Sequence, residues 1–206
     1  MKPTKDKEMI VKQTYWKNKQ FAYRAAEHLT TICRLGILSV CLSWLYSSNY
    51  LWFNVGALFF AFTLVPRIAL PKSNLRVITD TSISFLCCTH IVLGMNLGFY
   101  ESYQFYDKIM HAFGSALLTF LIITTVVQYC KHKKFTLPLF LHFFLVLGSS
   151  ISLGTIWEMF EFTVDQTGLF NAQRGLQDTM LDLVANFTGI ICVMLIYLKT
   201  NAIQKL

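Results

Sequence analysis

The amino-acid sequence predicts an all-α fold, a polytopic transmembrane helical bundle, and three observations support this fold class. The chain has 206 residues, of which 54% are hydrophobic, and its mean hydropathy is +0.48. Only 14% of the residues are charged, whereas a soluble domain carries about 25%. Long apolar runs alternate with short polar connections, which is typical of membrane-spanning helices.

Six apolar segments are each close to the roughly 20 residues that a helix needs to cross the hydrocarbon core. We expect spans over residues 29–46, 51–70, 77–100, 108–129, 137–164 and 178–198. Together they predict a single transmembrane domain over residues 29–206. The second span has an alternative, earlier end, because Pro66 lacks the backbone N–H that a helix interior needs.

Residues 1–28 predict a cytoplasmic or interfacial N-terminal arm. This arm contains seven Lys and Arg, interspersed with Tyr15, Trp16, Phe21 and Tyr23. Aromatic and basic side chains in this mixture are typical of an amphipathic helix that lies on the membrane surface. We therefore expect an N-terminal interfacial helix before the first span.

Small residues at four-residue spacing predict close contacts between the spans. The pairs are Gly94 and Gly98, Ser150 and Gly154, and Ala185 and Gly189. Such pairs let helix backbones approach closely in lipid.

The distribution of positive charge predicts the orientation. Fifteen of the 18 Lys and Arg lie in the N-terminal arm, in the 67–76 and 130–136 connections, or in the C-terminal tail. With six spans all four segments fall on one side, which the positive-inside rule makes cytoplasmic. We expect a multi-pass protein of the bacterial inner (plasma) membrane with both termini in the cytoplasm. The net charge of +7 follows this pattern, so membrane lipids are the expected partners and nucleic acid is not.

Six acidic residues and one histidine gather at the outer ends of the last three predicted spans. They are Asp107, His111, Glu158, Glu161, Asp165, Asp178 and Asp182. Spacings of three and four residues place those of one span on a common helix face, which Ser115, Ser150 and Asn186 extend inward. Ionisable residues are costly in a bilayer and usually mark a functional site.

Three kinds of chemistry suit this cluster. Carboxylates with one imidazole can bind a divalent metal ion, the only cofactor that the residues suggest. The predicted ligands are Asp107, His111, Glu158, Glu161, Asp178 and Asp182. Acid–base catalysis is the second possibility, with Glu158, Glu161 and Asp182 as catalytic groups. The third is a proton- or cation-coupled pathway.

A structural role is the alternative for part of the cluster. Asp107, Asp165 and Asp178 lie near helix ends, where a carboxylate can cap the helix. His111 can simply pair with Asp107. Lys108 and Arg174 can neutralise the carboxylates or bind an anionic headgroup. We also expect Arg76 and Asp80 to form an ion pair at the membrane interface. Glu158, Glu161 and Asp182 lie deeper in apolar sequence, where capping does not explain them.

Three linked motifs resemble the YjdF-type family of predicted bacterial inner-membrane proteins. Tyr106-Asp107-Lys108-Ile109-Met110-His111 with Gly114 resembles its YDr..H...G segment. Trp157-Glu158-Met159-Phe160-Glu161 is similar to its (W/Y)E-x-x-E segment. Gln177-Asp178-Thr179-Met180-Leu181-Asp182 is similar to its DT-x-x-D segment. The resemblance extends over about residues 75–198 and implies a polytopic inner-membrane protein without implying an activity.

The sequence therefore leaves three functions open. The first is a metal-dependent enzyme that acts on a lipid or envelope substrate. The second is a transporter that moves a cation or proton, and the third is a non-catalytic protein whose polar cluster sets helix register. The expected ligands are an ion, a small molecule or a lipid, and the oligomeric state is open.

Overall fold

The computed structural model describes residues 5–70 and 75–203, and every regular element in these ranges is a helix. The elements are α1 (Lys5–Tyr46), α2 (Tyr50–Ala69), α3 (Arg76–Cys88), the π-helix η1 (Thr89–Asn96), α4 (Phe99–Ser102), α5 (Tyr106–Lys133), α6 (Leu139–Asp165) and α7 (Leu176–Ile203). They form two compact units, Met1–Phe99 and Tyr100–Leu206. The all-α fold class is confirmed, and a single transmembrane domain over residues 29–206 stays a prediction.

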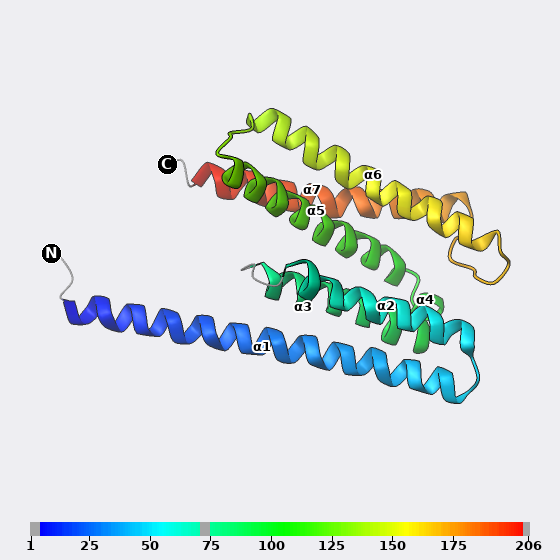
Figure 1. Cartoon of the computed structure of the whole chain (residues 1–206). Helices are drawn as coiled ribbons and strands as arrows, with labels where there is room; N and C mark the ends of the chain where they lie inside the picture. The colour runs from blue at the N-terminus through cyan, green and yellow to red at the C-terminus, as the bar shows by residue number, and fades with distance from the viewer. Residues whose placement is uncertain (1–4, 71–74, 204–206) are drawn as a thin grey trace. The chain divides into compact units, whose positions relative to one another are not determined.

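Six helical segments in the described ranges are long and apolar enough to cross a membrane, which confirms the predicted number (Figure 1). They are Lys17–Tyr46, Tyr50–Ala69, Arg76–Asn96, Tyr106–Lys133, Leu139–Asp165 and Leu176–Thr200. Pro66 does not shorten the second span. It lies in the last turn of α2, where a missing N–H removes only one hydrogen bond near the helix end.

Helix α1 runs without a break from the N-terminal arm into the first span. Residues 5–35 contain neither proline nor glycine, so nothing in the local sequence interrupts the helix. The side chains of residues 1–16 lie outside the described residues. The interfacial position of the arm therefore stays a prediction, as does the orientation, part of which rests on Lys72 and Lys205 outside the described residues.

The third span ends earlier than expected. α3 continues as the π-helix η1 to Asn96, and the N–H of Leu97 bonds the carbonyl of Val92 at 3.0 Å. Gly98 follows with a φ of 68°, a left-handed conformation that glycine adopts without a steric penalty. Because Gly98 lies beyond the helix, the prediction that Gly94 and Gly98 share one helix face is wrong.

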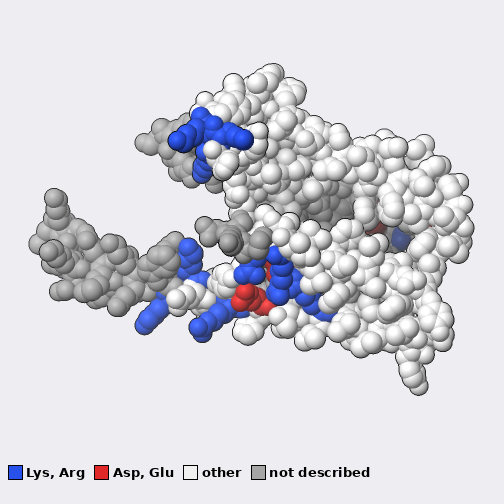
Figure 2. Space-filling model, viewed as in Figure 1, with Lys and Arg blue, Asp and Glu red and all other residues white. Residues whose placement is uncertain are grey.

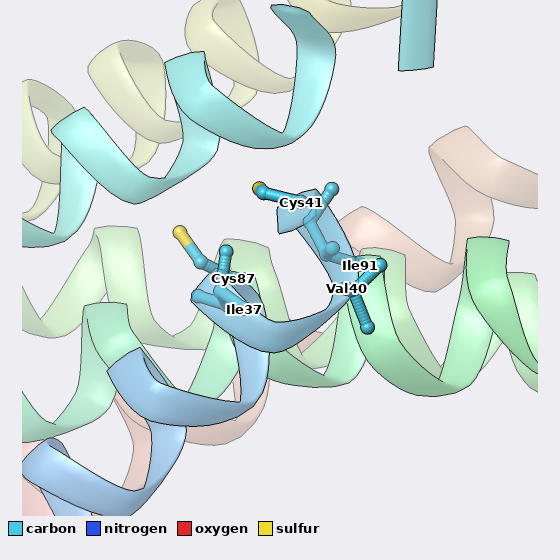
Figure 3. Packing of buried hydrophobic residues seen from close by; sticks show 5 residues of the cluster. All are labelled: Ile37, Val40, Cys41, Cys87 and Ile91. Carbon is cyan, nitrogen blue, oxygen red and sulfur yellow. The ribbon is translucent and has the colours of Figure 1, made fainter. Parts of the chain in front are cut away.

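Apolar side chains fill the centre of the first unit, between α1, α2 and α3. The buried cluster consists of Ile37, Val40, Cys41, Cys87 and Ile91 (Figure 3). Trp44 and Phe59 pack against it from α1 and α2. The interior of this unit is therefore a buried cluster of Ile, Val and Cys side chains surrounded by aromatic rings.

A buried ion-pair network joins the same three helices. Arg34 of α1 is only 9% exposed and bonds a carboxylate oxygen of Asp80 on α3. It also donates to the hydroxyl of Thr63 on α2 at 3.1 Å. Arg67 Nε donates to the other Asp80 oxygen at 2.9 Å. Two guanidinium groups therefore neutralise one buried carboxylate.

The predicted Arg76–Asp80 pair is wrong. Arg76 donates instead to the hydroxyl of Tyr23 at 2.6 Å and lies 3.6 Å from Glu27. Both partners belong to the first span, alongside the start of α3. Asp80 is buried among three helices, so it binds the cations that point into this interior, Arg34 and Arg67. Arg76 lies one turn away in the sequence, but it points toward Tyr23 and Glu27.

Helices α5, α6 and α7 form the second unit, and glycines set how closely they approach. A Cβ at Gly189 of α7 would collide with the backbone carbonyl of Ala112 on α5. A Cβ at Gly154 of α6 would lie 3.3 Å from Nδ2 of Asn186 on α7. The predicted small-residue faces on these two spans are therefore confirmed as contact faces.

Charged side chains occupy a small part of the helix surfaces. On the face shown in Figure 2, the visible Lys and Arg lie in a few groups, and most of the surface is uncharged. Large apolar side chains such as Phe140, Val184 and Ile196 are exposed. A surface of this kind is expected to face lipid.

Candidate functional site

The acidic cluster lies at one end of the second unit, where α5 and α7 begin and α6 ends. The structure brings together Asp107, Lys108 and His111 of α5, Glu158 and Glu161 of α6, and Asp178 and Asp182 of α7. Lys131, Lys133 and Lys134 lie at the opposite end of α5. At 1.5 Å per residue, this helix separates the two charged ends by about 35 Å, close to the thickness of a bilayer core.

His111 lies at the centre of the site and is 8% exposed. Its Nδ1 is 3.3 Å from a carboxylate oxygen of Glu158. Its Nε2 is 3.6 Å from oxygens of both Asp107 and Asp182, and 3.9 Å from Glu161. One imidazole therefore faces carboxylates from all three helices, so its role extends beyond the simple pairing with Asp107 that the sequence allowed.

Lys108 is the principal cation of the site. Its Nζ lies 2.5 Å from Asp178, 2.8 Å from Asp182 and 3.0 Å from Asp107. The sequence suggested that Lys108 could neutralise carboxylates, but it did not indicate which ones. One ammonium group balances one negative charge, whereas five carboxyl groups lie around Lys108 and His111.

Two carboxylates are deeply buried, and one of them lacks hydrogen bonds. Glu158 is 4% exposed and Asp182 is 2% exposed. Neither oxygen of Glu158 accepts a hydrogen bond from any residue that the structure describes, whereas both oxygens of Asp182 lie within 2.9 Å of Nζ of Lys108. Burying an ionised carboxylate without such partners costs several kcal/mol. Both residues are among the three that capping does not explain.

The remaining acidic residues have more ordinary partners. Glu161 accepts a hydrogen bond from Nε1 of Trp157 at 2.7 Å. Asp165 binds the backbone N–H groups of Ala172 and Gln173 at 2.8 and 2.7 Å, so it orders the loop between α6 and α7. Asp178 accepts the N–H of Arg174 at 3.1 Å, as the capping alternative predicts.

A row of polar side chains continues from the cluster into the unit. The hydroxyl of Ser115 donates to Oδ1 of Asn186 at 2.7 Å, and the hydroxyl of Thr119 donates to that of Ser150 at 3.1 Å. The row then meets a buried apolar cluster made of Ile123, Val146, Ile190 and Met194. Polar side chains therefore extend from one end of the unit to its middle.

Tyr100 adds a neutral hydroxyl beside the site. Burial raises the pKa of its phenol, and the negative charge of Asp107 raises this pKa further. Its ring packs edge-on against Tyr106 with centroids 5.1 Å apart, and its carbonyl accepts a hydrogen bond from Arg174 at 2.6 Å. Tyr100 therefore keeps its proton and adds no negative charge to the cluster.

Two overlapping sets of side chains have the spacing of metal ligands. One set is Asp107, His111 and Asp182, and the other is His111, Glu158 and Glu161. Within each set, one oxygen or nitrogen atom per residue lies within 4.8 Å of the others. Asp178 belongs to neither set, and its carboxylate binds Lys108. Its role as a metal ligand stays a prediction, as do the roles of the other five residues and the catalytic roles of Glu158, Glu161 and Asp182.

Sequence reasoning missed the pairing of charges inside the first unit. Arg34 is the single basic residue within the first predicted span, and its partner Asp80 lies on another helix. The available signal was one cation in the first span and one anion in the third, both within apolar sequence.

Comparison with known proteins places this chain in a family. The family described as "Predicted membrane protein (DUF2238)" matches residues 28–202. A protein of Thermotoga maritima described as "Uncharacterized protein" is 36% identical over 112 residues, which cover 54% of this chain and 57% of that relative. No solved structure matches the chain. The expected resemblance to an uncharacterised membrane-protein family is confirmed, and the chain belongs to the DUF2238 family of predicted membrane proteins.

Proposed function

We propose that this integral membrane protein binds a divalent cation at the acidic end of α5, α6 and α7. One observation carries the proposal: Glu158 is almost completely buried, and neither of its carboxylate oxygens accepts a hydrogen bond from a described residue. A buried carboxylate needs a compensating charge. The imidazole of His111 lies 3.3 Å from Glu158 and is itself surrounded by carboxylates.

The balance of charge supports a cation. Five carboxylates surround the site, whereas Lys108 supplies one permanent positive charge. A divalent ion would supply two further positive charges and would stabilise the ionised form of the carboxyl groups. Oxygen ligands suit Mg²⁺, Mn²⁺ and Ca²⁺, and the single imidazole also admits Fe²⁺ or Zn²⁺.

The spacing of the ligand atoms also supports a cation. Adjacent ligands around an octahedral ion at 2.0–2.1 Å are about 3 Å apart. From Nε2 of His111, the distances to Asp107, Asp182 and Glu161 are 3.6–3.9 Å, whereas Glu158 faces the other ring nitrogen, Nδ1, at 3.3 Å. Within each of the two ligand sets one atom per residue lies within 4.8 Å of the others, so movements of the side chains alone would bring them around one ion.

An enzyme and a transporter would use the bound ion in different ways. A metal-dependent enzyme would use the ion to polarise a substrate, with Glu158, Glu161 or Asp182 transferring protons. A cation- or proton-coupled transporter would need a path to the other end of the unit. The polar row ends against the apolar cluster around Ile123 and Val146, which supports binding at one membrane surface in preference to transport.

The test is metal binding by the purified full-length chain, stripped with a chelator and measured in lipid nanodiscs. We expect saturable binding of Mn²⁺, seen as loss of the free-ion electron paramagnetic resonance signal. Removal of a ligand in Glu158→Gln should weaken binding at least tenfold, since even groups that only support a ligand are worth 10–100-fold.

Two further measurements make this test decisive. Glu101→Gln is a matched control, because Glu101 is an exposed residue of α4 and its loss should leave Mn²⁺ affinity unchanged. Without metal, Glu158→Gln should unfold at a higher temperature than wild type, since it removes an uncompensated charge. Absence of saturable Mn²⁺ binding, with thermal stability unaffected by Mg²⁺, Ca²⁺, Fe²⁺ or Zn²⁺, would rule out the proposed function.

A further inference from the structure

The ammonium group of Lys108 is held as a bound cation would be held. Three carboxylates from two helices surround its Nζ, at 2.5 Å for Asp178, 2.8 Å for Asp182 and 3.0 Å for Asp107. The side chain is largely buried. A lysine at a helix start would ordinarily extend toward water, so its inward direction calls for an explanation.

Two of these carboxylates face both Lys108 and His111. Asp107 directs Oδ2 to the ammonium group at 3.0 Å and Oδ1 to Nε2 of His111 at 3.6 Å. Asp182 lies 2.8 Å from the ammonium group and 3.6 Å from the same imidazole nitrogen through its Oδ1. Both carboxylates therefore bridge two neighbouring positions in the same cluster.

Helix bundles hold two metal ions side by side with carboxylates that project inward from several helices. Here the first position is bounded by His111, Glu158 and Glu161, and the second is bounded by Asp107, Asp178 and Asp182 around Lys108. The unpartnered oxygens of Glu158 belong to the first position, whereas all three acidic residues of the second already bind the ammonium group.

We infer that Lys108 occupies the second cation position of a two-cation carboxylate site, so that the protein binds one divalent ion and its own ammonium group takes the place of a second ion. This inference rests on the proposed function, because it assigns the single ion to the position of His111, Glu158 and Glu161. The tethered ammonium group holds Asp107 and Asp182 in place and neutralises part of their charge. Lys108 is thus a positioning residue that sets the number of bound ions.

The test is the stoichiometry of Mn²⁺ binding in Lys108→Met, which keeps most of the stem and removes the charge. We expect two Mn²⁺ per chain in this variant and one in wild type. Two ions bridged by carboxylates should also show the magnetic coupling of a Mn²⁺ pair in the paramagnetic resonance spectrum. Lys108→Arg keeps the positive charge and should still bind one ion.

Further variants guard against ambiguous results. Lys131→Met removes an exposed lysine at the other end of α5 and should bind one ion. Asp178→Asn should leave the single ion of wild type in place, yet in combination with Lys108→Met it should return the stoichiometry from two to one. Lys108→Gln replaces Lys108→Met if the latter does not fold.

The outcomes separate the two proposals. If wild type binds one Mn²⁺ and every neutral substitution of Lys108 also binds one, the two-position inference is wrong while the proposed function stands. If neither wild type nor the Lys108 variants bind Mn²⁺, the proposed function itself is wrong.

Discussion

Replacing Gly189 by alanine tests whether the close approach of α5 and α7 holds the acidic site together. Gly189 lies against Ala112, the residue that follows His111. A Cβ at this position would collide with the carbonyl oxygen of Ala112, and it would come within 2.9 Å of the carbonyl carbon and 3.2 Å of the Cα. All three are backbone atoms, so rotating a side chain cannot relieve the collision.

The size of the effect follows from these distances. Non-bonded carbon atoms favour separations of about 3.5–4.0 Å, so the helices would have to separate by up to about 1 Å. Overpacking of this kind lowers the free energy of unfolding by about 1–3 kcal/mol. The better helix propensity of alanine raises it by at most about 1 kcal/mol. We expect Gly189→Ala to destabilise the protein by about 1–2 kcal/mol, which lowers the unfolding temperature by roughly 2–8 °C for a chain of this size.

The assay compares apparent unfolding temperatures in one detergent with those of Gly148→Ala. Gly148 is also a helical glycine, but no described atom lies within 4 Å of a Cβ built there, so this variant should match or exceed wild-type stability. Gly189→Ala should also bind Mn²⁺ more weakly, because separating the helices moves Asp182 away from His111. Unchanged stability of Gly189→Ala would refute the close approach of α5 and α7.

Three further predictions concern the ion pairs, the loop and the orientation. Asp80→Asn leaves Arg34 buried without its counter-ion and should destabilise the protein by about 3–5 kcal/mol; Glu27→Gln, at an exposed pair, should cost less than about 1 kcal/mol in the same thermal unfolding assay. Asp165→Asn weakens the hydrogen bonds that order residues 166–175, so this loop should be cut faster by protease while Mn²⁺ affinity stays unchanged; equal cutting rates would contradict the role of Asp165. An alkaline phosphatase fusion should be inactive at the C-terminus and active when inserted in residues 166–175, and the reverse pattern would overturn the expected orientation.

The local sequence was sufficient to predict the helices and the composition of the polar cluster. Each span is a property of its own apolar length, so six spans could be counted without knowing how they pack. Asp107 and His111 share a helix face because they are four residues apart, and Glu158 and Glu161 do so because they are three apart. Motif order alone then suggested that α5, α6 and α7 carry one site.

Pairings between helices could not be read in the same way. Asp80 binds Arg34 and Arg67 and not the nearby Arg76, because the partner of a buried charge depends on which faces of the neighbouring helices meet. Asp165 looked like a member of the acidic cluster, yet it turns to the backbone of the following loop.

The sequence by itself determined that this protein is a helical membrane protein with carboxylates and a histidine at one end of three spans. Only the tertiary structure decided that Lys108 bonds three of those carboxylates while Glu158 is left without a hydrogen bond from the described residues. The physical reason is that helical periodicity fixes which residues share a face, whereas helix rotation and depth fix which faces meet. The rotation and depth of each helix are set by contacts between residues that are distant in sequence, such as the approach of Gly189 to Ala112.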